Sequence, residues 1–216
     1  IRIAACAMIA GVSYVFASFS VAFATTGYEL DRPTMLVVPV LASFVALIYT
    51  PFGGLLADKI GRKTVFIIGA LGAGLTTVPY LWSITVGNWP LIFVFAILNF
   101  SVLYMMANAV WPSFFAEMFP TRVRASGLTV GTQIGFAISG GIAPVLSTAL
   151  AGPDLKGWVG PAILAAVFAA VAVGLALTEK ETSRYTLAEL DDVQQTEREK
   201  AAVTAATVLP TATSAA

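Results

Sequence analysis

The sequence predicts an all-α membrane protein in which six transmembrane helices form one bundle. Hydrophobic residues make up 58% of the 216 residues and charged residues only 11%, whereas soluble domains carry about 25% charged residues. The charges are also clustered, and the long stretches between the clusters contain none. Because roughly 20 mostly apolar residues cross the hydrocarbon core of a bilayer, we expect each stretch to contain membrane-spanning helix.

Six spans account for these charge-free stretches. The expected spans are residues 3–26, 33–57, 64–86, 90–116, 125–151 and 158–178. The stretch from Thr64 to Ala116 is too long for one helix, and we divide it at the turn sequence Gly87-Asn-Trp-Pro. Residues 1–178 therefore form the expected six-span bundle, and residues 179–216 are expected to be a polar, mostly disordered cytoplasmic tail.

The basic residues predict the side of the membrane on which each connection lies. Connections on the cytoplasmic side carry an excess of Lys and Arg. One side of the expected bundle holds Arg2, Lys59, Arg62, Lys63, Arg122, Arg124, Lys180, Arg184, Arg198 and Lys200. The other side holds Arg32 and Lys156. We therefore expect a plasma-membrane protein with both chain ends in the cytoplasm and the connections near Asp31, Asn88 and Asp154 facing outward.

The composition argues against several classes of function. The formal net charge is zero, so nothing in it favours nucleic-acid binding. The chain has no His and a single Cys, Cys6, and the expected spans contain no Asp, Glu, Lys or Arg. The usual routes to metal binding and to acid–base catalysis are therefore missing. We expect no cofactor, no metal and no enzyme activity.

The connection after the second span contains the most specific motif, Gly54-Leu-Leu-Ala-Asp58-Lys-Ile-Gly61-Arg62-Lys63. Gly61 permits a tight turn between two helices. The Asp58 carboxylate can cap a helix N-terminus or pair with an arginine, and Arg62 and Lys63 hold the connection in the cytoplasm. The segment resembles the G-x-L-a-D-r-x-G-R-k signature of the major facilitator superfamily. The resemblance implies a latch on the cytoplasmic gate; a purely topogenic basic loop is the alternative.

A second motif follows the fourth span and reads Glu117-Met-Phe-Pro-Thr-Arg122-Val-Arg124-Ala-Ser-Gly. It resembles the E-x-F-P-T-x-x-R-x-x-G segment of sugar-porter-like members, and its two arginines most resemble the metabolite:proton symporter group. That group carries organic acids such as oxoglutarate, citrate or shikimate, and zwitterions such as proline and betaine. The resemblance implies that Glu117, Arg122 and Arg124 belong to the gate.

The same resemblance implies that the six spans correspond to helices seven to twelve of a twelve-helix protein. The chain begins at Ile1 without an initiator Met, which we expect of a chain whose N-terminal six-helix half lies elsewhere. Proton relays usually contain an ionisable group within a span, and none is present here. The resemblance therefore implies that any coupling acid belongs to the missing half.

Neutral polar side chains supply the candidate substrate contacts. They are Tyr14 and Ser18 in the first span, Ser101, Tyr104, Asn108 and Trp111 in the fourth, and Gln133 in the fifth. The four residues of the fourth span share one face of a regular α-helix. Because polar side chains avoid lipid, we expect these faces to point into the bundle or a wet cavity. Hydrogen bonding between helices is the alternative role.

Small residues predict where the helices approach closely. Gly127, Gly131 and Gly135 recur every four residues and are followed by Ser139, a pattern typical of close helix–helix packing in membranes. The third span contains a similar set, Gly69, Gly72 and Gly74.

Together these features predict transport of a small organic solute, such as an organic acid or an osmolyte, coupled to protons by alternating access. The expected partners are the solute, protons, the lipid bilayer and the missing N-terminal half. Three alternatives stay open: an uncoupled facilitator of the same fold, a six-helix membrane enzyme or channel subunit, and a non-transporting chain that needs its other half.

Overall fold

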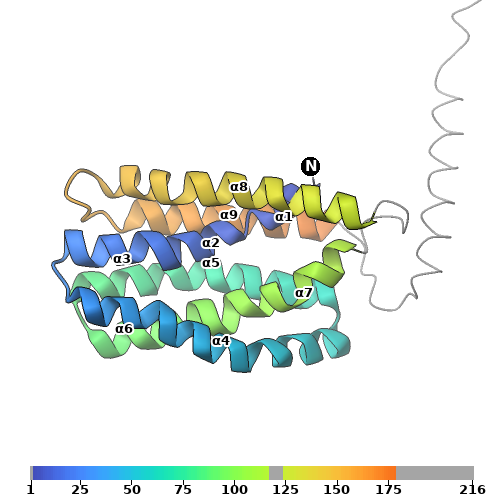
Figure 1. The fold of residues 1–216 in the computed structure, drawn as a ribbon, viewed down its shortest axis with the longest axis horizontal. Helices are drawn as coiled ribbons and strands as arrows, with labels where there is room; N and C mark the ends of the chain where they lie inside the picture. Colours follow the sequence, from blue (N-terminus) through green and yellow to red (C-terminus); the bar gives the residue numbers. More distant parts are fainter. Residues whose placement is uncertain (1, 117–123, 179–216) are drawn as a thin grey trace, which may run out of the picture.

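The computed structural model describes residues 2–116 and 124–178, and the regular elements among them are helices. Six helical spans are long and apolar enough to cross a membrane, and Figure 1 shows them as one elongated bundle. They are Ile3–Gly27, Arg32–Ile60, Arg62–Val86, Trp89–Ala116, Ala125–Ala151 and Val159–Thr178. The predicted fold class and number of spans are therefore confirmed, and the boundaries differ by a few residues. The expected tail, residues 179–216, lies outside the described residues.

Two of the spans are divided into shorter helical elements. The first span consists of α1 (Arg2–Ala7), α2 (Ala10–Tyr14), a π-helical segment (Val15–Phe19), α3 (Ser20–Ala22) and a second π-helical segment (Phe23–Gly27). The fourth span consists of α6 (Trp89–Ala96), a π-helical segment (Ile97–Tyr104) and α7 (Met105–Ala116). The other four spans are α4 (Arg32–Ile60), α5 (Arg62–Val86), α8 (Arg124–Ala151) and α9 (Val159–Thr178).

Short polar residues begin the second and fourth spans. The Asp31 carboxylate accepts a hydrogen bond from the Thr34 backbone N–H (2.9 Å) and another from the Thr34 hydroxyl. These bonds hold the pKa of Asp31 below its usual value. The Asn88 amide oxygen accepts from the Leu91 backbone N–H (3.3 Å) in the same way. Gly87, with φ of 68°, ends α5 just before Asn88, which confirms the predicted turn.

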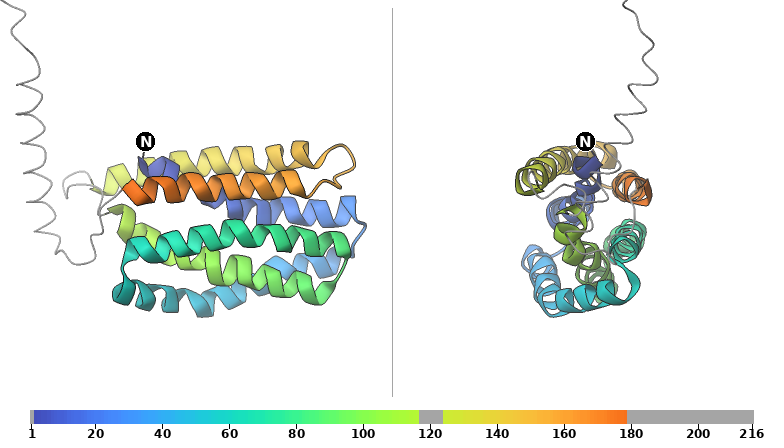
Figure 2. Two further views of the ribbon diagram at one scale, coloured as in Figure 1. Left: turned by 180° about the vertical axis from the view of Figure 1, so that it is seen from behind. Right: turned by 90° about the vertical axis from the view of Figure 1, so that its right-hand side faces the viewer.

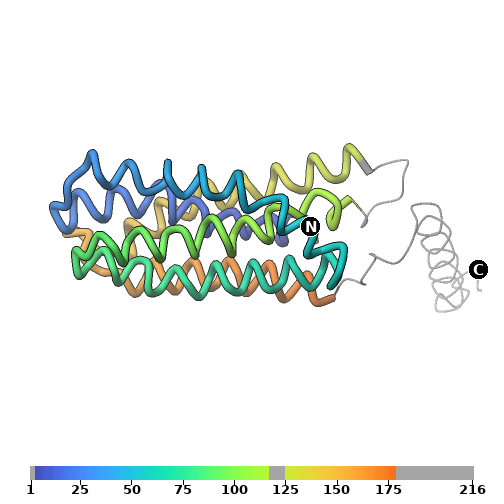
Figure 3. Tube along the Cα trace, turned by 90° about the horizontal axis from the view of Figure 1, so that it is seen from below, coloured from blue at the N-terminus to red at the C-terminus, as the bar shows by residue number. Residues whose placement is uncertain are grey.

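The helices pack in a definite order around the bundle, and Figure 3 shows them lying along its length as seen from below. The first span lies against α8 and α9, α5 lies against α9 and the fourth span, and α4 lies against the fourth span. In the end-on view of Figure 2, α8 and α4 flank one side of the bundle, and the first and fourth spans form its middle. We call this side, formed by α4, the first span, the fourth span and α8, the open face.

Close packing of small residues joins α8 to the first span. Gly135 lies directly against Ala4 and Ala7 of α1, and a Cβ atom built on Gly131 would lie 2.9 Å from Ile3. Neither position leaves room for a side chain, so the helix backbones approach closely. The packing role predicted for Gly131 and Gly135 is confirmed. Gly69 of the third span behaves similarly, because a Cβ atom there would meet the backbone of the fourth span.

A buried amide joins α5 to the fourth span. Asn99 lies in the π-helical segment of the fourth span and is 1% exposed. Its Nδ2 donates to the backbone carbonyl of Ala73 (2.7 Å) and to the hydroxyls of Thr76 and Thr77 (both 3.0 Å). A buried polar group is costly without such partners, so these bonds fix how the two spans sit against each other.

We expect the change Gly135→Leu to destabilise the bundle, because the new side chain would have to separate α8 from α1. Overpacking of this kind costs about 1–3 kcal/mol. The measurement is reversible unfolding of the chain in mixed detergent micelles, followed by circular dichroism. Gly174→Leu in α9 is the matched control, since nothing lies within 4 Å of a Cβ atom at that position. Equal stability of the two variants would contradict the packing interpretation.

Candidate functional site

Three of the candidate residues proposed from the sequence are exposed in this structure. Tyr14 is 36% exposed and its ring lies against Gly140 of α8, where a Cβ atom would be 2.8 Å from the ring. Ser18 and Gln133 are exposed, and neither makes a hydrogen bond to another described residue. Their polar atoms are therefore available to a ligand or to another part of the protein.

Stacked aromatic rings connect the first and fourth spans beneath the open face. The Phe16 and Phe100 rings are stacked with centroids 4.8 Å apart, and Phe100 stacks in turn on Tyr104 with centroids 5.4 Å apart. Phe16 also contacts Tyr80 of α5 (5.2 Å), whose hydroxyl forms a hydrogen bond with the Ser20 hydroxyl (3.0 Å). Aromatic pairs with this geometry stabilise the contact beyond simple burial, so the floor of the open face is firmly packed.

The four candidates in the fourth span do not share one face, and that expectation was wrong. Ser101 is fully buried, and its hydroxyl donates to the backbone carbonyl of Ala42 in α4 (2.6 Å). Tyr104 is 8% exposed and its hydroxyl faces Ser13 of the first span. The physical reason is the π-helical segment Ile97–Tyr104, because each π-helical turn holds more residues than an α-helical turn. The regular spacing assumed from the sequence is therefore lost there.

Asn108 and Trp111 form a hydrogen-bonded pair on α7. The indole Nε1 of Trp111 donates to the Asn108 amide oxygen (2.9 Å), and the indole ring meets Phe136 of α8 edge-on (5.7 Å). The Asn108 Nδ2 lies 3.5 Å from the Met105 sulfur, and a thioether is a weak acceptor. The amide N–H groups of the half-buried Asn108 therefore have capacity for a further hydrogen bond.

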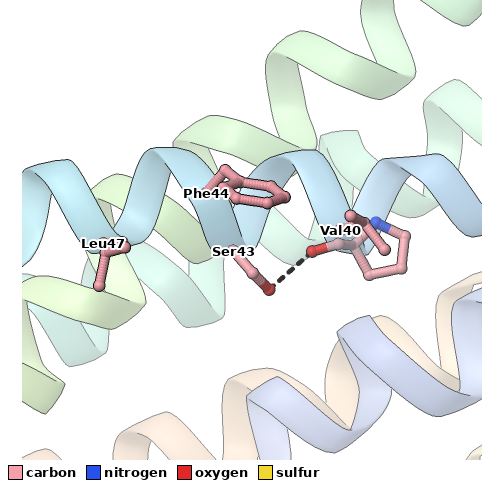
Figure 4. A pocket seen from close by; sticks show the side chains of 5 residues that line it. Val40, Ser43, Phe44 and Leu47 are labelled. Carbon is pink, nitrogen blue, oxygen red and sulfur yellow. Dashed lines mark hydrogen bonds between the residues drawn. The ribbon is translucent and has the colours of Figure 1, made fainter.

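A hollow on α4 was missed by the sequence analysis. It has a volume of about 430 Å³ and is lined by Pro39, Val40, Ser43, Phe44 and Leu47, which Figure 4 shows as sticks. The sequence analysis singled out none of the uncharged polar residues of the second span, which are Thr34, Ser43, Tyr49 and Thr50.

The motif at residues 54–63 forms the predicted tight turn. Gly61 ends α4 and begins α5 with φ of 96°, a backbone conformation that favours glycine. Its N–H donates to the Ala57 carbonyl (2.9 Å). Asp58 is exposed, and α5 begins without a side-chain cap, so Asp58 does not cap that helix. Gly54 lies in the last turns of α4 with nothing within 4 Å of a Cβ position.

The lysine of this motif reaches the end of the last span. Lys63 Nζ donates to the backbone carbonyl of Leu177 (2.9 Å) in the final turn of α9. A cation is favourable there, because the carbonyl groups at a helix C-terminus lack partners and carry partial negative charge. Arg62, which directly precedes Lys63 and is the first residue of α5, is half-buried. The motif therefore connects the α4–α5 turn to α9.

The second motif lies largely beyond the described residues. Glu117 and Arg122 are outside them, and Arg124 is the first residue of α8, with a side chain that is not described. Their role in a gate stays a prediction.

The open face has a distinct chemistry. It offers hydroxyl, amide and aromatic groups, while charged side chains stand at the ends of the spans. Among residues 2–116 and 124–178, no group of three or more His, Cys, Asp or Glu side chains gathers where it could hold a metal ion.

Six long apolar helices whose charged side chains stand at their ends define a multi-pass membrane protein. A model of the Major Facilitator Superfamily matches residues 3–213. The chain belongs to the Major Facilitator Superfamily, which confirms the resemblance seen in the two motifs. No solved structure matches the chain.

Several characterised proteins are similar to this chain. The shikimate transporter of Escherichia coli (strain K12) is 27% identical over 171 residues, which are 79% of this chain and 39% of the relative. The citrate-proton symporter of Klebsiella pneumoniae is 30% identical over 144 residues, 67% of this chain and 32% of the relative. The proline/betaine transporter of Escherichia coli (strain K12) is 26% identical over 156 residues, 72% and 30% respectively. The chain thus spans about a third of these relatives. All three are transporters, in agreement with the expectation that the chain is not an enzyme.

We expect the change Lys63→Gln to loosen the last turn of α9, because the Leu177 carbonyl would lose its charged donor. Since the contact is exposed, the effect should be modest, roughly two- to fivefold faster amide exchange. Hydrogen–deuterium exchange of a peptide covering residues 172–178 measures it in detergent micelles. Lys59→Gln, an exposed lysine in the last turn of α4, should leave this peptide unchanged. An unaltered exchange rate in Lys63→Gln would contradict the proposed contact.

Proposed function

We propose that this chain is the C-terminal half of a secondary transporter that moves a small organic solute across the plasma membrane together with protons. The observation that carries the proposal is the open face, on which hydroxyl, amide and aromatic groups stand in otherwise apolar spans. Polar groups at membrane depth mark a solute pathway or a contact within the protein. Family membership and the transporters similar to this chain support the first of these roles.

The remaining parts of the proposal follow from the same arrangement. Residues 1–178 form the transport bundle and residues 179–216 a polar tail, and both chain ends lie in the cytoplasm, as the excess of basic residues favours. A second six-helix half covers the open face and completes a site near the middle of the membrane. That half supplies the ionisable group for proton coupling, since the spans of this chain carry none.

Proton-coupled transport is tested with the complete reading frame that contains this chain, purified and reconstituted in liposomes. Uptake of labelled shikimate, citrate, alpha-ketoglutarate, proline and glycine betaine is measured with and without an inside-alkaline pH gradient. We expect one class of these solutes to accumulate, and a protonophore to abolish the accumulation. Uptake that only equilibrates the solute and ignores the gradient would favour the uncoupled facilitator, for which the absence of ionisable groups in these spans is the supporting observation. No uptake of any organic solute would refute the proposal.

The contrast between Asn108 and Ser101 provides a second prediction. Asn108→Leu removes an amide with spare hydrogen-bonding capacity, and losing one such bond to the solute should raise KM about three- to tenfold. Ser101→Ala should leave KM within about twofold, because the Ser101 hydroxyl is already used by the Ala42 carbonyl. Initial uptake rates over a range of solute concentrations measure both values. Equal effects of the two changes would show that the face was assigned incorrectly.

A further inference from the structure

Two connections between spans meet at one end of the bundle. Residues 28–31 join the first span to α4, and residues 152–158 join α8 to α9. Figure 1 shows both at the end opposite to the one where the chain begins. The Tyr28 hydroxyl donates to the backbone carbonyl of Lys156 (2.8 Å), although 128 positions separate the two residues in the sequence. The two connections are therefore bonded directly to each other.

Gly27, the last residue of the first span, brings the two backbones together. A Cβ atom at this position would lie against the Leu155 carbonyl group, so the approach requires glycine. Tyr28 and Leu155 also pack against the apolar core, and the Tyr28 ring meets the buried Phe23 ring edge-on (5.1 Å). Backbone contact and ring packing thus reinforce the hydrogen bond.

Both connections contain a residue in an unusual backbone conformation. Glu29 has φ of 52° and Leu155 φ of 49°, and among the described residues these are the two non-glycine positions with positive φ. Such conformations are unfavourable for residues with a side chain, and they persist where the surrounding contacts hold them. Their occurrence in the two connections that touch indicates that each connection holds the other in shape.

The contact attaches a part of the first span that has few other contacts with α8 and α9. Residues 2–19 of this span make most of its packing against those two helices, whereas α3 and Phe23–Gly27 pack mainly against α4. Helix packing alone would therefore allow the end of the first span to tilt away from α8 and α9. The bonded connections provide the attachment that restrains this tilt.

We propose that residues 27–31 and 152–158 form a clasp that stays closed throughout the transport cycle, so that the end of the first span moves together with the α8–α9 hairpin. The inference rests on the proposed transport function, because only a transporter that alternates between conformations gives the clasp a motion to restrain. Movement within this half then takes place elsewhere in the bundle.

The existence of the clasp is tested by Tyr28→Phe in the complete transporter that contains this chain. The change removes the hydrogen bond and keeps the ring, and we expect about two- to tenfold faster amide exchange in peptides covering residues 24–31 and 152–158 alike. Tyr49→Phe is the matched control, because the Tyr49 hydroxyl forms no hydrogen bond with another described residue. Unchanged exchange in residues 152–158 of Tyr28→Phe would overturn the clasp.

The motion of the clasp is tested by locking it. Glu29 and Lys156 line one surface pocket between the two connections, and the Lys156 side chain takes no part in the bond that its backbone accepts. In protein whose other cysteines are replaced, Glu29→Cys and Lys156→Cys are joined by a short bismaleimide crosslinker before reconstitution. We expect the crosslinked protein to take up solute within about twofold of the rate of the untreated double variant. Each single-cysteine variant, treated with the same reagent, controls for the modification itself.

The outcomes separate this inference from the function on which it rests. Loss of uptake on crosslinking, with both treated single-cysteine variants active, would overturn the proposal, because the clasp would then have to open during transport. Failure of the two thiols to crosslink would overturn it as well, since the connections would lie apart. If the unchanged protein takes up no organic solute, the proposed function fails, and the concerted motion fails with it, whereas the exchange measurement still decides whether the clasp exists.

Discussion

In the hydrocarbon interior of a membrane, every backbone N–H and C=O group must find its hydrogen-bond partner within the protein. This constraint accounts for the six helical spans and also for how their serine and threonine residues behave. Ser43, Thr50, Thr77 and Ser139, for example, donate their hydroxyl protons to the carbonyl four residues earlier in the same helix. A hydroxyl in these spans is therefore weak evidence for solute binding, unless it is exposed on the open face.

The spans of the bundle differ in how tightly they are packed. The first span, α5 and α9 are joined by small residues and a buried aromatic stack, which leave no space for a ligand. By contrast, α4 and α8 are the least buried spans, with 22% and 28% of their most apolar stretches buried, against 61% for the first span. Side chains for solute recognition can vary on these two helices without disturbing the packing beneath them.

The sequence was sufficient for the number and placement of the spans, because charges stand only at their ends and turn residues such as Asn88 and Gly61 begin or end helices locally. It was insufficient for the fourth span. There the π-helical segment places Ser101 in contact with α4 and Tyr104 near the first span. The residue types of this segment do not predict a π-helix.

The buried amide of Asn99 has a mechanical consequence. Its Nδ2 donates to the Ala73 carbonyl and to two threonine hydroxyls of α5, and sliding the fourth span past α5 would leave this buried amide without acceptors in an apolar interior. Relative sliding of these two spans is therefore unfavourable. A change of tilt within the bundle is easier between α4 and the first span, which contact each other mainly through α3 and Phe23–Gly27. Tilting of α4 away from the first span would therefore break fewer polar contacts than sliding of the fourth span past α5.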